Sequence, residues 1–224
     1  MKRYLFFLIL LTTIVHSGYT QKMVEDSIKL YIKMGGEYAI LPSHKLQYFS
    51  TPVRGAFRTD DSGYTNISAN VAGGVSYGLF RLEVGTSLSW LEIDDYGVVS
   101  AKDVAIPIVF SVRVMQKSGF GVHVGLEFEP HKFFDYHNGN DSRVVSDWGT
   151  KGGMFVEVSK DITRRLSFFA KFGFDATLAP STLWADNQDD ATSPHSYYTP
   201  AMYHGNTFSI GIGLLWNIAD IMYK

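Results

Sequence analysis

A strict alternation of apolar and polar residues returns eight times along this chain and constrains the fold more than any other feature. In Ile28–Ile40 the even positions are nearly all apolar, and the odd positions are mostly polar or small. A period of two places these sets on opposite faces of a β-strand, whereas a helix repeats its apolar positions every three or four residues. We therefore predict eight strands of roughly ten residues each: Ile28–Ile40, Asn66–Tyr77, Arg81–Trp90, Asp103–Val114, Gly121–Glu129, Gly153–Ser159, Leu166–Asp175 and Phe208–Ile218.

Tight turns and longer loops alternate between these stretches. Three connections are short, at Gly78, Gln116–Gly119 and Lys160–Thr163. The other four run about 41–63, 91–100, 130–150 and 179–206, and three of them are long. Short turns at one end and long loops at the other are typical of outer-membrane barrels, whose turns are periplasmic and whose loops are external.

The fold class that follows is all-β: an eight-stranded antiparallel up-and-down transmembrane β-barrel. Aromatic residues on the apolar parity at both strand ends match two membrane interfaces, and a soluble lipocalin-type barrel would turn its apolar parity inward. These residues are Tyr77, Phe80, Phe120 and Trp216 at the turn end, and Tyr38, Trp90, Phe128, Trp148 and Phe208 at the loop end. Pro52, Arg54 and Arg58 indicate that the first loop adds no membrane strand pair, because Pro cannot donate to a ladder and Arg is costly facing lipid.

The N-terminus has the layout of a secretory signal peptide. Met1-Lys2-Arg3 is positive, Tyr4–Val15 is largely apolar, and the small residues Gly18 and Thr20 precede the expected cleavage after Thr20. The apolar run is shorter than the roughly 20 residues of a spanning helix. We therefore predict a signal peptide at 1–20, a barrel domain at 21–224, and export to the bacterial outer membrane.

Charge and composition exclude several classes of function. With 20 Lys and Arg against 22 Asp and Glu, the chain lacks the basic surface that nucleic acid requires. The absence of cysteine excludes disulfides, thiolate zinc sites and thiol nucleophiles. There is no phosphate loop or dinucleotide fingerprint, so we expect no cofactor and no metal, and outer-membrane lipid as the main partner.

Two stretches carry a resemblance to known barrels. Asp103–Phe110 resembles the strand with an Ile-Pro-aliphatic motif in the PorT-like outer-membrane β-barrel family. Ser209–Trp216 is similar to the terminal β-signal read by the barrel-assembly machinery, as in small OmpA-OmpX-like barrels. The resemblance extends as a pattern over nearly the whole mature chain and implies fold and location. It implies little chemistry, since most members have no known activity.

Charged residues gather on the polar parity, which faces the barrel interior. An eight-stranded barrel is just wide enough for side chains to fill it, and buried charges must be paired, so near-balance predicts an ion-pair network and not an aqueous pore. The expected network is Lys33, Arg81, Glu83, Arg113, Glu127, Glu157, Lys171 and Asp175. We expect Arg81, Glu83, Arg113 and Glu157 near the turns, Lys33, Glu127 and Lys171 centrally, and Glu37, Asp103, Glu129 and Asp175 toward the loops with Lys151.

Histidine and acidic residues were compared with those of barrel enzymes. None of the mature histidines is followed two residues later by Ser, as in lipid A deacylases. The pairs Asp60-Asp61, Asp94-Asp95 and Asp189-Asp190 resemble those of omptin proteases, but omptins have ten longer strands. His131 and His137 flank Asp135 at a spacing that suits a metal, yet nothing fixes their geometry, so we interpret both as solvated loop histidines. We expect His123 to join the interior network.

These observations predict a monomeric, closed, non-enzymatic barrel with a structural or surface-interaction role. Aromatic residues on loops carried by a rigid scaffold are candidates for binding another protein or a surface ligand. The candidates are Phe49, Tyr64, Phe133, Phe134, Tyr136, Trp184, Tyr197 and Tyr198. Two alternatives stay open: a rim hydrolase of lipid or peptide with loop Asp and His as acid and base, and a narrow channel.

Overall fold

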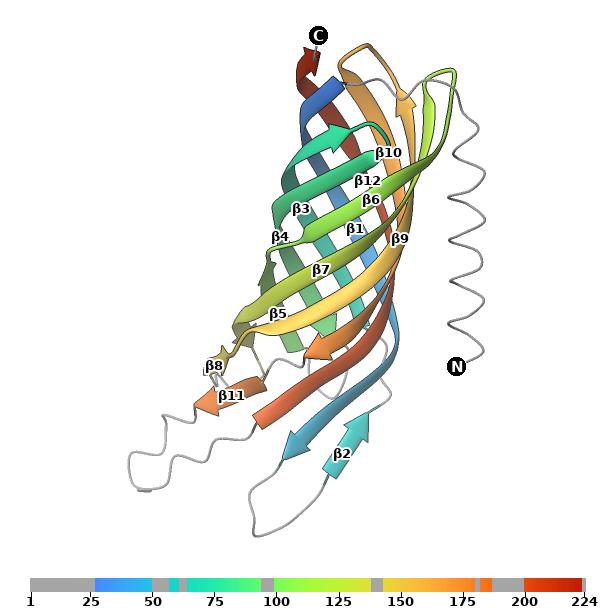
Figure 1. The fold of residues 1–224 in the computed structure, drawn as a ribbon. Coiled ribbons are helices and arrows are strands. Elements are labelled where there is room, and N and C mark those ends of the chain that lie inside the picture. The colour runs from blue at the N-terminus through green and yellow to red at the C-terminus, as the bar shows by residue number, and fades with distance from the viewer. Residues whose placement is uncertain are drawn as a thin grey trace.

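The computed structural model describes residues 27–49, 57–60, 64–93, 99–137, 143–179, 182–186 and 200–222. Within these ranges the chain forms twelve strands: β1 (Ser27–Phe49), β2 (Phe57–Asp60), β3 (Tyr64–Tyr77), β4 (Phe80–Ile93), β5 (Val99–Ala105), β6 (Ile108–Lys117), β7 (Phe120–His137), β8 (Arg143–Ser146), β9 (Gly149–Asp161), β10 (Leu166–Ala179), β11 (Thr182–Asp186) and β12 (Pro200–Met222) (Figure 1). None of the described residues belongs to a helix that is long and apolar enough to cross a membrane. The expected signal peptide, 1–20, lies outside the described residues.

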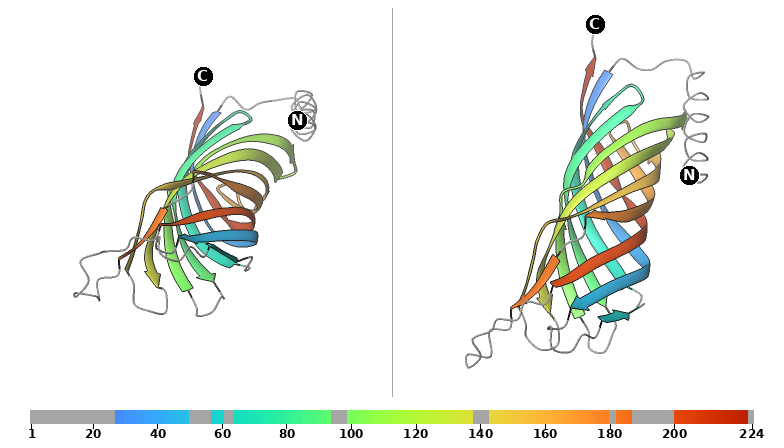
Figure 2. Two further views of the ribbon diagram at one scale, coloured as in Figure 1. Left: turned by 90° about the horizontal axis from the view of Figure 1, so that it is seen from below. Right: turned by 60° about the horizontal axis from the view of Figure 1, so that its bottom comes forward.

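Eight antiparallel strands close into a barrel (Figure 2). We call each strand of this ring a stave, and β5 and β6 together form one stave. The ring runs β1, β3, β4, β5 with β6, β7, β9, β10 and β12, and β12 pairs back with β1 from Ser27↔Met222 to Tyr48↔Ala201. The tight turns join β3 to β4, β6 to β7 and β9 to β10, as the sequence predicted. The predicted eight-stranded up-and-down antiparallel barrel is confirmed.

The segments β5 and β6 form a single stave that is interrupted at Pro107. The register with β4 continues across the break, from Ser87↔Ala105 to Val84↔Ile108. Proline has no N–H to donate to the ladder, but the Gly85 N–H still donates to the Pro107 carbonyl oxygen at 3.0 Å. The sheet therefore loses one ladder hydrogen bond at this proline, and the register on the two sides of it is the same.

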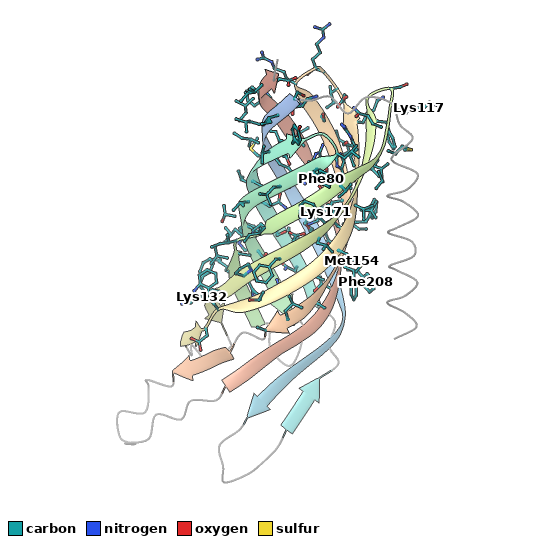
Figure 3. The ribbon with its side chains drawn as sticks, in the orientation of Figure 1. Phe80, Lys117, Lys132, Met154, Lys171 and Phe208 are labelled. Atoms are coloured by element: carbon teal, nitrogen blue, oxygen red, sulfur yellow. The ribbon has the colours of Figure 1, made fainter. Side chains whose placement is uncertain are left out.

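The two faces of the wall have opposite character. Apolar side chains on the outward parity are exposed, and Figure 3 shows Phe208 and Met154 on the outer surface while Lys171 lies inside. All nine aromatic residues expected at the two interfaces face outward or lie half-buried, from Tyr77 and Trp216 at the turn end to Trp90 and Trp148 at the loop end. The buried apolar side chains point inward, so the core of this protein is the barrel lumen.

Three staves are much longer than the roughly ten residues expected from membrane thickness. β1 and β12 each have 23 residues and β7 has 18. Parts of the predicted loops at 41–63, 130–150 and 179–206 therefore belong to strands. The alternation that revealed the strands depends on having lipid on one side and the lumen on the other. Backbone pairing continues after the lipid ends, where the sequence no longer has to alternate.

These longer strands build a sheet that stands beyond the loop-side end of the ring. Past Leu41, β1 leaves β3 but stays paired with β12, after a register shift between Ile40 and Ser43 that contains Pro42. A proline is tolerated at such a bulge because no ladder donor is required there. β2 adds to β1, β11 adds to β12 and β8 adds to β11, which gives the order β2-β1-β12-β11-β8. We call this sheet the loop-side extension; Arg58 lies in it, outside the eight-strand ring.

Candidate functional site

Three buried aromatic side chains point into the lumen, each lying over a glycine of the neighbouring stave. Tyr31 faces Gly74, Phe155 faces Gly125 and Phe169 faces Gly213. A Cβ at Gly74 would lie 2.3 Å from Tyr31 Cζ, and one at Gly125 would lie 2.4 Å from Phe155 Cζ. The glycines therefore allow these rings to lie flat against the wall, and all three rings are buried.

Beside these rings is a first ion-pair group, the turn-side cluster of Tyr31, Lys33, Arg81, Glu83 and Glu157. Lys33 Nζ lies 3.1 Å from Glu83 Oε2 and 2.5 Å from Glu157 Oε2. Arg81 Nη1 donates to Glu157 Oε1 at 2.9 Å, and the Tyr31 hydroxyl donates to Glu83 Oε1 at 3.0 Å. Lys33 belongs to β1 and Glu157 to β9, which are not neighbours in the ring, so this pair spans the lumen.

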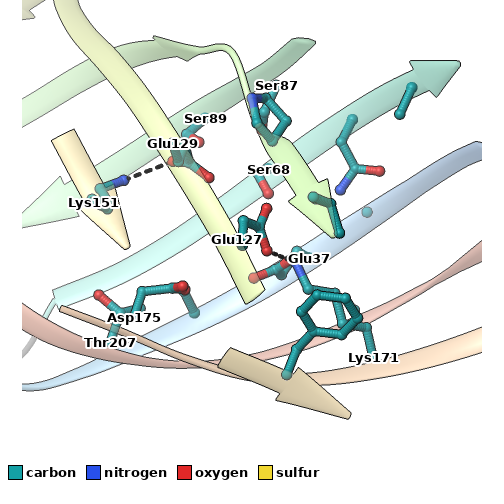
Figure 4. A pocket seen from close by; sticks show the side chains of 18 of the residues that line it. Glu37, Ser68, Ser87, Ser89, Glu127, Glu129, Lys151, Lys171, Asp175 and Thr207 are labelled. Atoms are coloured by element: carbon teal, nitrogen blue, oxygen red, sulfur yellow. Dashed lines mark hydrogen bonds and ion pairs between the residues drawn. The ribbon is translucent and has the colours of Figure 1, made fainter. Parts of the chain in front are cut away.

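A second group, the central cluster of Glu37, Glu127 and Lys171, lies toward the loops. Lys171 Nζ is 2.5 Å from Glu127 Oε2 and 3.3 Å from Glu37 Oε2. It thereby links β10 to β7 and to β1, neither of which pairs with β10. Figure 4 shows the lysine between these carboxylates.

Each closing ring also carries a cation over its face. Lys33 Nζ lies 4.5 Å from the ring centroid of Phe169, and Lys171 Nζ lies 5.3 Å from that of Phe155. The Arg81 guanidinium lies 5.6 Å from the ring of Tyr31. Cation–π attraction becomes stronger when the cation is desolvated, so the rings and the ion pairs support one another as one closure. We call the three rings and the turn-side and central clusters together the plug.

A third group, the loop-side cluster, consists of Asp103, Glu129, His131 and Lys151. Lys151 Nζ is 3.2 Å from Glu129 Oε1 and 3.4 Å from Asp103 Oδ2. His131 Nδ1 lies 3.3 Å from Asp103 Oδ2, and both side chains are fully buried. The interpretation of His131 as a solvated loop histidine is therefore wrong: β7 continues past Pro130, and position 131 keeps the inward parity of 123, 125, 127 and 129.

The plug separates two chambers, so side chains do not fill the lumen completely, although the sequence had led us to expect that they would. The loop-side chamber, of about 70 Å³, is lined by the central cluster, Glu129, Lys151 and Asp175 (Figure 4). Phe155 and Phe169 also line it. The turn-side chamber, of about 130 Å³, is lined by Tyr31, Arg81 and residues of the turns. Both are polar and large enough to hold water, since one water needs about 10–15 Å³.

The structure brings together six of the eight expected network residues through the ion pairs of the plug. Lys33, expected at the centre, lies nearer the turns and contacts Glu83 and Glu157. The Tyr31 hydroxyl donates to the same Glu83. Arg113 donates a hydrogen bond to the Gly78 carbonyl oxygen at 3.0 Å, and Asp175 lines the loop-side chamber. The pairing of His131 with Asp103 was not predicted, although the unbroken inward parity of β7 in the sequence could have revealed it.

The structure describes only some of the aromatic residues expected to form contacts on the loops. Phe134 is exposed on β7. Phe49, Tyr64, Phe133, Tyr136 and Trp184 have described backbones in β1, β3, β7 and β11, but their side chains lie outside the described part, as do Tyr197 and Tyr198 entirely. Among described residues, no group of three or more His, Asp or Glu side chains is arranged to hold a metal ion.

The comparisons with known proteins agree on the fold. No protein-family model matches the chain, and no curated protein sequence matches it. Solved structures do: OprG from Pseudomonas aeruginosa (TM-score 0.61, 11% identity, 88% of this chain and 99% of that chain), AlkL in DMPC bilayers (0.56, 10%, 89% and 94%) and Neisserial surface protein A (0.55, 11%, 84% and 97%). At these identities the likeness shows the fold alone, which is that of small outer-membrane β-barrels.

Proposed function

We propose that this protein is a closed, non-conducting outer-membrane barrel that acts through its external face. The turns lie in the periplasm and the loop-side extension lies outside the cell. The exposed apolar band with aromatic rings at both ends supports this placement, because such belts suit the two interfaces of a bilayer. Export by the peptide at 1–20 and membership of the PorT-like family, based on Asp103–Phe110 and Ser209–Trp216, remain predictions.

The observation that carries the proposal is the plug. Its cations contact carboxylates on non-neighbouring staves, and its three buried rings lie over glycines of the lumen wall beside these ion pairs. Opening a path would require charges such as Lys33 and Glu157 to separate within a buried environment, where the loss of one partner typically costs about 3–5 kcal/mol. A barrel closed in this way is better suited to binding at its rim than to transport.

The loop-side extension is the surface that we propose for binding. Its edge strands, β2 and β8, each end the sheet path among the described strands, so their outer backbone groups are available for pairing with another chain. Phe134 is exposed on β7 at the same end. The partner is another protein or a surface ligand, and we propose the aromatic residues named above as its contacts.

The geometry gives less support to a rim hydrolase. Asp103 and His131 form the Asp–His pair seen among the described residues, and both are fully buried. A general acid or base must come within hydrogen-bond reach of the group that it protonates, and a buried pair meets no substrate. We therefore propose a positioning role for this pair, in which it fixes β5 against β7.

Planar-bilayer recording tests the closed state. We expect the purified full chain to show no steady open state. A stable ohmic conductance would contradict the proposal and would favour the narrow channel.

Site-specific photocrosslinking in intact cells tests external binding. We expect a benzoylphenylalanine at position 134 to form a protein adduct, and the same group at the exposed, lipid-facing position 172 to form none. Equal yields at both positions, or no protein adduct at 134, would contradict a binding role for this end of the barrel.

A further inference from the structure

The turn-side chamber has an uneven charge balance that the ion pairs of the plug do not explain. Its lining includes four cationic side chains, Lys29, Arg81, Arg113 and Arg164, and one carboxylate, Asp161. Asp161 also accepts a hydrogen bond from Ser167 Oγ at 2.7 Å. Glu157 contacts Arg81 from the plug. Asp220 on β12 lies directly opposite Lys29 in the ladder. Cationic side chains still outnumber the carboxylates of the lining and these two neighbours, in a partly enclosed space where electrostatic attraction is stronger than in bulk water.

A buried histidine provides a second, independent observation. His123 lines the chamber, its side chain is only 3% exposed, and its Nδ1 has no hydrogen-bond partner among the described residues. It lies on β7 directly opposite Arg113 on β6. A buried polar nitrogen without a partner is costly. A ligand atom in the chamber that accepts a hydrogen bond would satisfy it.

The remaining lining completes a set of donors for an oxyanion. Ser76 contributes a hydroxyl group and Gln116 contributes an amide, whereas the Ser159 hydroxyl donates to the Gly121 carbonyl oxygen at 3.5 Å. Guanidinium groups match the geometry of phosphate oxygens especially well. The exposed Arg164 belongs both to the lining and to the β9–β10 turn, so the chamber reaches the surface at the turn end.

We propose that the turn-side chamber is a binding site for a phosphate group, held by Arg81, Arg113, Arg164 and Lys29 with His123 as an additional donor. A dianionic phosphate fits the charge excess better than a monoanionic carboxylate. The ligand is either inorganic phosphate or the terminal phosphate of a larger molecule. This site is at the opposite end from the external surface proposed above and does not depend on it.

Calorimetric titration of the refolded full chain with inorganic phosphate, at constant ionic strength, tests the site. Arg164→Gln is the main variant, because Arg164 is exposed and the barrel does not need it to fold. Arg165→Gln is its matched control: the neighbouring residue of the same turn, equally exposed, does not line the chamber. We expect Arg164→Gln to weaken phosphate binding roughly tenfold, as for one charge-assisted hydrogen bond, and Arg165→Gln to change it less than twofold.

A second variant and two further ligands sharpen the result. His123→Leu should weaken phosphate binding about fivefold, because it removes one hydrogen bond. Acetate should bind at least tenfold more weakly than phosphate. Glycerol phosphate binding as tightly as phosphate would identify the end of a larger molecule as the ligand, whereas much weaker binding would identify free phosphate. Equal losses in the Arg164 and Arg165 variants, acetate binding as tightly as phosphate, or no measurable phosphate binding would overturn the proposal.

Discussion

The two chambers on either side of the plug differ in how their charges are balanced. The loop-side chamber is lined by three lysines and five carboxylates, and each lysine forms an ion pair with at least one of these carboxylates. The turn-side chamber is lined by four cations and a single carboxylate. The linings of the two chambers therefore differ in the ratio of cationic to anionic side chains.

This difference separates two uses of buried charge in a small barrel. Ion pairs that bridge non-neighbouring staves, such as Lys171 to Glu127, hold the ring closed and specify which stave faces which. An excess of one sign does not by itself stabilise the fold, because like charges repel, and it is one ground for the binding site that we propose in the turn-side chamber. The predictions below test whether the plug and the two chambers play these separate roles.

The largest effect is expected from shortening a ring of the plug. Phe169→Ala should lower the free energy of unfolding by about 3–5 kcal/mol, because it removes a buried ring that covers Gly35 and Gly213 and lies under Lys33. Phe168→Ala is the matched control, since Phe168 is the next residue on the same stave and faces outward. Urea unfolding in lipid vesicles measures both. A loss as large for Phe168 as for Phe169 would show that the plug is not the stabilising core.

The next effect concerns the ion pairs. Lys171→Ala should destabilise the barrel by about 3–5 kcal/mol if the central cluster is dry, because Glu127 and Glu37 would be left buried without their cation. Lys151→Ala should cost less, because its partner Glu129 is 22% exposed, so water can replace the lysine there. Its other partner, the fully buried Asp103, keeps His131 Nδ1 at 3.3 Å.

A double variant checks the origin of this loss. Lys171→Ala combined with Glu127→Gln should be more stable than Lys171→Ala alone, since one stranded carboxylate is removed. If the second substitution only adds to the destabilisation, the cost does not come from unpaired charge.

The membrane-facing part of the fold was predictable because every stave must meet the same requirement. Each stave must place apolar residues in lipid and small or polar residues in the lumen, so the alternation in Ile28–Ile40 or Leu166–Asp175 reveals both the strand and its inward face. The same parity indicated which charges share the lumen. It could not fix their axial positions, because stagger between tilted staves decides that Lys33 meets Glu83 and Glu157.

The features that were not predicted lie where the strands no longer have to alternate apolar and polar residues. β1, β7 and β12 continue beyond the lipid, where pairing depends on backbone hydrogen bonds and leaves no period in the side chains. His131 falls in the loop expected at 130–150, yet the Pro130 carbonyl oxygen accepts a hydrogen bond from the Ile106 N–H at 2.9 Å and the strand continues. The chambers also were not predictable, because they depend on how three rings lie against glycines on neighbouring staves.

The smallest effect should differ in sign between the two chambers. Asp175 lies among the carboxylates of the loop-side chamber, in the field of Glu127, Glu129 and Glu37, which the cation Lys171 offsets only in part. Asp175→Asn should therefore leave stability unchanged or raise it by up to about 1 kcal/mol, because it relieves like-charge repulsion. Asp161 accepts a hydrogen bond from Ser167 and is the one carboxylate among four cations of the turn-side lining, so Asp161→Asn should lower stability by about 1 kcal/mol. Urea unfolding at neutral pH compares the two substitutions, which remove the same charge from nearly isosteric side chains. Opposite signs are expected only if the chambers hold opposite potentials. Equal changes would mean that the charge counts of the two linings do not describe the fields inside them.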